Sequence, residues 1–172
     1  MTPEHARIRG YLQAQATKLS PPAIVDKVRA AMSQLGAAAA AVPAARFAER
    51  PAPEEWSANE VMAHVVDAGR FFGGAITAVL DDGVVPAARR ERRPVSETRT
   101  AVAWQRLLEA DREALFARVA EAEPSARLQA TIEHGMFGPL NWRETLLFLR
   151  LHDLDHAGQL SKITAALTAV HT

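Results

Sequence analysis

Cysteine is absent from this chain of 172 residues. Disulfide bonds, thiolate ligands for metals, iron–sulfur clusters and a cysteine nucleophile are therefore excluded. The formal net charge is zero, so the chain as a whole does not attract nucleic acid or an anionic membrane electrostatically. We therefore expect neither nucleic acid nor a membrane as a partner.

Long hydrophobic runs are missing as well. No segment approaches the roughly 18–20 consecutive apolar residues that a membrane-spanning helix requires, and residues 1–20 lack the apolar core of a secretory signal peptide. We therefore expect a soluble, cytoplasmic protein. With 48% hydrophobic and 23% charged residues, the composition is typical of a globular protein, and the length predicts a single domain over residues 1–172.

Helical periodicity dominates the chain, in four segments separated by connectors that contain proline or glycine. We predict helices over about residues 21–42, 57–80, 96–122 and 141–167. Ser57 with Glu60, and Asn141 with Glu144, have the spacing of capping boxes, which mark helix starts. The sequence therefore predicts an all-α fold, a four-helix bundle over residues 21–170. Residues 1–20 would extend it by a helical turn or two, and residues 127–138 could form a short hairpin.

The connector between the second and third helices, residues 81–95, is unusually long. At about 3.3 Å per residue it can span the length of a bundle, so these two helices could run parallel. The connector also holds the one basic cluster, with arginines at Arg89, Arg90, Arg92 and Arg93. An anion-binding or nucleic-acid patch is one interpretation, but the zero net charge favours a solvated connector.

Three histidines fall on apolar helix faces. In the last helix His152 and His156 continue the stripe of Leu149, Leu160 and Ile163, and in the second helix His64 lies between Val61 and Ala68. Histidines four residues apart on a helix have Cβ atoms about 5–6 Å apart, which allows two imidazoles to bind one metal ion. Three imidazoles that meet inside a bundle would form an open site for zinc, nickel or iron.

Aspartates close to these histidines in sequence could accept the second ring N–H of a ligand and so offset the cost of burial. The positions concerned are Asp67, Asp153 and Asp155. The Glu-x-x-His pairs of di-iron bundles are absent, which favours a single metal ion. A different interpretation stays open, because inward histidines also occur as hydrogen-bonded core residues of a helical scaffold.

Three short motifs resemble one known family. They are "EWSANEVMAHVVDA" (55–68), "FGPLNWRETL" (137–146) and "LHDLDHAGQL" (151–160). Their order and separations are similar to those of the DinB-like (damage-inducible, YfiT-like) four-helix-bundle metal proteins. The resemblance covers roughly residues 20–170, and the first twenty residues lie outside it.

The resemblance implies one divalent metal ion, zinc, nickel or iron, bound by His64, His152 and His156. It also implies an up-down-down-up bundle and a homodimer. Characterised members of the family include transferases and isomerases that use a low-molecular-weight thiol such as mycothiol or bacillithiol. Because this chain lacks cysteine, thiol chemistry would need such an external thiol.

Few accessory groups stand out. His134 precedes the last helix, where an exposed loop histidine is the simplest interpretation and an acid/base at the metal site the alternative. Gln159 follows the His-x-x-x-His pair and could pack or hydrogen-bond locally. We identify no catalytic base, and whether the protein is an enzyme stays open.

We therefore carry two functional hypotheses forward. The first is a metal-dependent enzyme with a three-histidine site, acting as a low-molecular-weight-thiol S-transferase or a small-substrate hydrolase. The alternative is a non-catalytic metal- or ligand-binding stress-response protein.

Overall fold

The computed structural model describes residues 2–85, 87 and 97–169, and within them the chain is mostly helical. The elements are α1 (Pro3–Lys18), α2 (Pro21–Ala41), a 3-10 turn (Ala44–Arg46), α3 (Ala58–Asp82), α4 (Ala101–Ala120), β1 (Ile132–His134), β2 (Gly138–Leu140) and α5 (Trp142–Ala169). The all-α prediction is confirmed. None of the described helices is long and apolar enough to cross a membrane.

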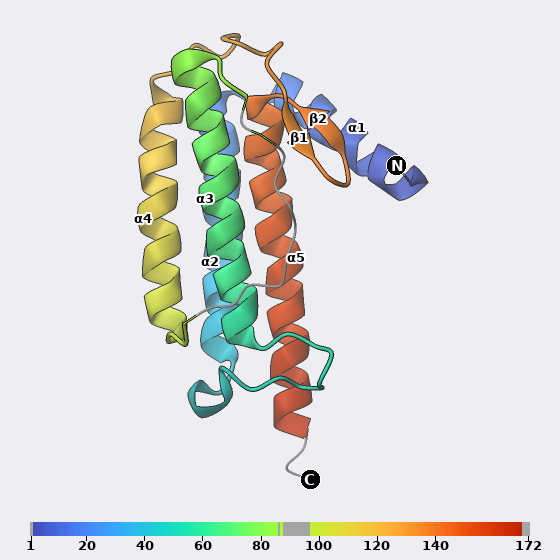
Figure 1. Cartoon of the computed structure of the whole chain (residues 1–172), viewed down its shortest axis with the longest axis vertical. Coiled ribbons are helices and arrows are strands. Elements are labelled where there is room, and N and C mark those ends of the chain that lie inside the picture. The colour runs from blue at the N-terminus through green and yellow to red at the C-terminus, as the bar shows by residue number, and fades with distance from the viewer. Residues whose placement is uncertain (1, 86, 88–96, 170–172) are drawn as a thin grey trace.

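The four long helices form a bundle in which α2 and α5 run in one direction and α3 and α4 in the other (Figure 1). This is the up-down-down-up order that the resemblance implied, and α3 and α4 are parallel. Helix α5 packs against both α2 and α3. The arginine cluster Arg89–Arg93 lies outside the described residues.

The two predicted capping boxes form as expected. The Ser57 hydroxyl accepts a hydrogen bond from the Glu60 amide, and the Ser57 amide donates to the Glu60 carboxylate. Asn141 and Glu144 make the same reciprocal pair before α5. These caps set where α3 and α5 begin, and hence the turn of each helix on which the histidines lie.

The first twenty residues form more than the predicted turn or two. Helix α1 has 16 residues and packs on α5, burying Leu12 and Ala16. Two buried apolar side chains in a polar segment are a weak periodic signal. Packing on α5, rather than the sequence pattern of the segment itself, therefore stabilises this helix. In Figure 1, α1 and the β1–β2 hairpin lie on the same side of α5.

Two other boundaries differ from the predictions. Helix α4 begins at Ala101, where the Thr100 hydroxyl accepts a hydrogen bond from the Ala103 amide, so the predicted start at residue 96 was too early. The hairpin forms, but it pairs Ile132 with Leu140 and therefore extends two residues beyond the predicted range.

Candidate metal centre

Helices α3 and α5 bring the three predicted histidines together. One ring nitrogen from each of His64, His152 and His156 lies within 4.8 Å of the others. Among the described residues, this is the one group of three or more histidines, cysteines or carboxylates that meets so closely. All three rings are partly buried, so the group lies near the surface of the bundle without being sealed inside it.

The geometry of the three rings fits a small divalent ion. His64 Nε2 and His152 Nε2 are 3.1 Å apart, and two lone pairs at that distance repel unless a proton or a cation lies between them. Tetrahedral zinc with Zn–N bonds of about 2.0–2.1 Å places its nitrogen ligands roughly 3.3–3.4 Å apart. Three imidazoles are also a suitable donor set for nickel or iron.

Gln159 orients the third histidine. Its side-chain oxygen lies 2.8 Å from His156 Nδ1. An amide oxygen only accepts hydrogen bonds, so this contact places the proton on Nδ1 and leaves the Nε2 lone pair available to a metal ion. The sequence analysis gave Gln159 only a local role; its position three residues after His156 on the same helix was the available signal.

Asp153 is the best placed of the three predicted aspartates. It is fully buried, and its Oδ1 lies 4.0 Å from His152 Nδ1. The same oxygen accepts a hydrogen bond of 3.0 Å from Arg112 of α4, which is 1% exposed. Burial raises the pKa of Asp153 to about 6, against the opposing effect of the Arg112 guanidinium.

Sequence analysis missed Arg112. It lies on the buried stripe of α4 with Trp104, Leu108, Leu115 and Val119. A single arginine at helical spacing among apolar residues implies a buried anionic partner, and that pattern was the signal available. The partner could not be identified without the fold, because Asp153 is 41 residues away in sequence.

The other two aspartates are exposed. Asp67 lies on α3 one turn beyond His64, and its role at the site stays a prediction. Asp155 lines a pocket together with His152, and its role as a hydrogen-bond partner of a ligand histidine stays a prediction.

The interpretation of His134 as an exposed loop residue was wrong. His134 is 4% exposed on β1, where its Nε2 lies 3.2 Å from the Thr145 hydroxyl. Its ring stacks on Phe72 at 4.4 Å and meets Phe148 edge-on at 4.6 Å. The hairpin folds back onto this aromatic cluster, and Phe148 also contacts His152 at 5.5 Å. His134 is therefore a core residue one aromatic layer from the three histidines, outside their group.

Burial of His134 predicts an acid-sensitive stability. Burial lowers its pKa from 6.5 to about 4, so between these values the unfolded chain binds a proton that the folded protein does not. The free energy of unfolding should therefore fall as the pH drops from 6.5 to 4, by up to about 3 kcal/mol from this residue. Urea unfolding of the wild type and of His134→Gln at several pH values in this range measures the dependence of the free energy of unfolding on pH. An equal dependence in both proteins would contradict the prediction.

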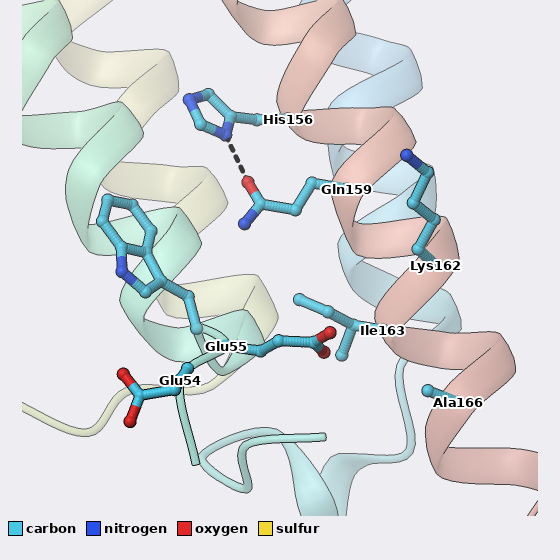
Figure 2. Close-up of a pocket in the computed structure, with 8 residues that line it drawn as sticks. Glu54, Glu55, His156, Gln159, Lys162, Ile163 and Ala166 are labelled. Atoms are coloured by element: carbon cyan, nitrogen blue, oxygen red, sulfur yellow. Dashed lines mark hydrogen bonds between the residues drawn. The ribbon is translucent and has the colours of Figure 1, made fainter. Parts of the chain in front are cut away.

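Two pockets flank the three histidines. The first, called here the loop pocket, has a volume of about 700 Å³ and contains His156, Gln159 and Lys162 of α5 and Glu54, Glu55 and Trp56 of the loop before α3. Figure 2 shows the Glu55 carboxylate extending toward α5, whereas that of Glu54 points away from it. His156 lines this pocket, and Trp56, another lining residue, meets the His64 ring at 5.1 Å.

The second pocket, called here the α1 pocket, has a volume of about 660 Å³. It lies between α1, the hairpin and the N-terminal half of α5, and His152 forms part of its wall. Because His152 and His156 line different pockets, the three-histidine group can be approached from two sides.

The helical fold agrees with the comparisons to known proteins. A sequence profile of the DinB superfamily matches residues 6–160. The chain therefore belongs to the DinB superfamily, as its motifs indicated, and the match includes most of α1, which the motifs had left out. No curated protein matches the chain.

A solved structure with a similar fold is a histidine-to-alanine mutant of the mycothiol-dependent maleylpyruvate isomerase. The TM-score is 0.61 and the sequence identity is 17%; the similarity covers 84% of this chain and 62% of the isomerase. This chain therefore spans less than two thirds of that protein. At this identity the likeness establishes the fold alone.

Proposed function

We propose that the protein is a metal-dependent enzyme that transfers a low-molecular-weight thiol to a small acceptor, with one divalent ion held by His64, His152 and His156. The observation that supports this most strongly is the approach of one nitrogen from each ring to within 4.8 Å of the others. Three protein ligands with an accessible further position are typical of catalytic metal sites, whereas structural sites are closed.

The proposed chemistry divides between the ion and the chain. A bound divalent ion makes a thiol or a water molecule acidic enough to ionise near neutral pH. The chain contributes the positions of the rings: Gln159 holds the proton on His156 Nδ1, and the Arg112–Asp153 pair lies against His152. In the transfer, the thiol proton leaves to solvent and the sulfur forms a bond to an electrophilic carbon. A leaving group then departs with the bonding electrons.

The polar loop pocket favours a hydrophilic thiol as the donor. Its lining includes the carboxylate of Glu55, the ammonium of Lys162 and the amide of Gln159. These groups can hydrogen-bond hydroxyls and amides, as a sugar-containing thiol would require. Mycothiol, the thiol used by the isomerase of similar fold, is therefore the first donor to test, and bacillithiol the second.

Cobalt substitution tests this function directly. When mycothiol is added to the cobalt-loaded protein, we expect a thiolate-to-cobalt charge-transfer absorption, because the thiol takes the open position. The disulfide form of mycothiol has no S–H group and should leave the spectrum unchanged. Ester hydrolysis without a thiolate band would instead establish a hydrolase, and neither signal in a metal-loaded protein would favour the non-catalytic alternative.

Gln159 offers a separate test of the metal centre. Gln159→Leu removes the acceptor for His156 Nδ1–H, and loss of such an outer hydrogen bond typically costs about 10–100-fold in metal affinity. Gln159→Glu keeps an acceptor oxygen and should retain affinity near the wild-type value. Competition with a chromogenic chelator measures both, and equal affinity in all three proteins would show that the amide does not orient His156.

A further inference from the structure

The α1 pocket is the second approach to the three histidines. Phe148 and His152 follow each other by one turn on α5, with ring centroids 5.5 Å apart, and both line this pocket. Its volume of about 660 Å³ falls within the range of small-molecule sites, roughly 300–1,000 Å³. A molecule bound here would therefore lie beside a proposed metal ligand.

Most of the surface that lines this pocket is apolar, and several of its side chains are aromatic. The lining includes Ile8 and Tyr11 of α1, Met136 and Phe137 of the hairpin turn, and Phe148 and Leu151 of α5. Tyr11 is 40% exposed and Met136 47% exposed, and both are large hydrophobic residues at the surface. They come from segments far apart in sequence, yet they meet at one pocket. Exposed apolar side chains gathered with polar neighbours are typical of ligand sites.

The charges of the α1 pocket oppose an anionic ligand. Its lining carries the formal charges of two carboxylates, Glu4 and Asp155, and of one guanidinium, Arg7, together with the imidazoles of His5 and His152. A dicarboxylate such as maleylpyruvate would meet net negative charge here, whereas an uncharged ring would not. Phe137 and Phe148 already pack edge-to-face at 5.9 Å, and a further aromatic ring can join such an arrangement favourably.

We propose that the α1 pocket binds the acceptor substrate, and that the acceptor is an uncharged aromatic small molecule. The role as acceptor rests on the proposed thiol transfer, but the binding of an aromatic molecule does not. Each pocket then binds one of the two substrates. The loop pocket binds the hydrophilic thiol beside His156, and the α1 pocket binds the acceptor beside His152.

The test uses 1,3-dinitrobenzene, an uncharged aromatic probe without a leaving group, and titration calorimetry on the full chain. Met136→Glu places a carboxylate at the exposed side of the pocket and should raise the Kd about tenfold. Val102→Glu is the matched control, because Val102 is 58% exposed on α4 and does not line the pocket. It should bind the probe as the wild type does.

Several results would overturn the proposal. These are an unchanged Kd in Met136→Glu, an equal loss in Val102→Glu, or tighter binding of benzoate than of the neutral probe. A change of sedimentation coefficient in Met136→Glu alone would show that a second copy covers the pocket, and would also overturn it. Metal content, measured on the same samples, separates the two proposals. If the probe binds in a way that depends on Met136 but the protein takes up no metal, the α1 pocket is a binding site for aromatic molecules and the proposed metal-dependent enzyme is excluded.

Discussion

His156→Ala is expected to abolish stoichiometric binding of a divalent metal. The wild-type protein should bind about one equivalent, because three ring nitrogens lie within 4.8 Å of one another. Two histidines alone hold zinc, nickel or iron far less tightly than three. The loss should exceed the roughly 100-fold that removal of an outer hydrogen-bond partner can cost. Elemental analysis of protein purified without a nickel-chelating tag measures the metal content.

The matched control is His5→Gln, which removes a histidine that lies outside the three-histidine group. It should keep the wild-type metal content, while His64→Ala and His152→Ala should lose the metal as His156→Ala does. Full occupancy in any of the three alanine variants would exclude that residue as a required ligand. If the wild type stays metal-free after attempted loading, the alternative interpretation holds, in which all three histidines are hydrogen-bonded core residues.

Arg112→Met is expected to destabilise the fold by about 3–5 kcal/mol, the usual cost of leaving one member of a buried ion pair unpaired. Arg112 is 1% exposed and Asp153 is fully buried, and their hydrogen bond measures 3.0 Å. A loss of this size is a large share of the roughly 5–15 kcal/mol that stabilises a typical protein. Urea unfolding at neutral pH, where the wild-type Asp153 carboxylate is mostly ionised, measures the change.

Two further variants isolate the effect of burial. Arg29 and Glu113 form an ion pair of 2.8 Å whose side chains are about half exposed, and Arg29→Met should cost at most about 1 kcal/mol. In the double variant Arg112→Met/Asp153→Leu no buried charge stays unpaired, so most of the lost stability should return. A double variant as unstable as Arg112→Met would show that packing, not the unpaired carboxylate, causes the loss.

Local chemistry explains which structural predictions were correct. A capping box consists of two residues three positions apart that satisfy each other's backbone groups, so Ser57 with Glu60 could be identified without the fold. The inward direction of His152 and His156 follows from the helical period and the leucines around them. The long connector allowed α3 and α4 to run parallel, and the resemblance to the DinB superfamily supplied the helix order.

Contacts between distant segments explain what was missed. His134 is polar and lies next to glycine, so its sequence indicates an exposed loop; it is buried because the hairpin folds onto Phe72 and Phe148. Helix α1 has a weak apolar pattern and depends on packing against α5. The two pockets are likewise formed by segments that meet only in the folded chain.

The sequence by itself determined the helical segments of the bundle, the starts of α3 and α5 and the inward faces of three histidines, because each follows from residues a few positions apart. Only the tertiary structure decided that the three rings meet, that Arg112 pairs with Asp153, and that two pockets, one more apolar than the other, flank the site. The physical reason is that each of these contacts joins side chains from different elements. Their distances depend on how whole helices pack, and no local pattern encodes that packing.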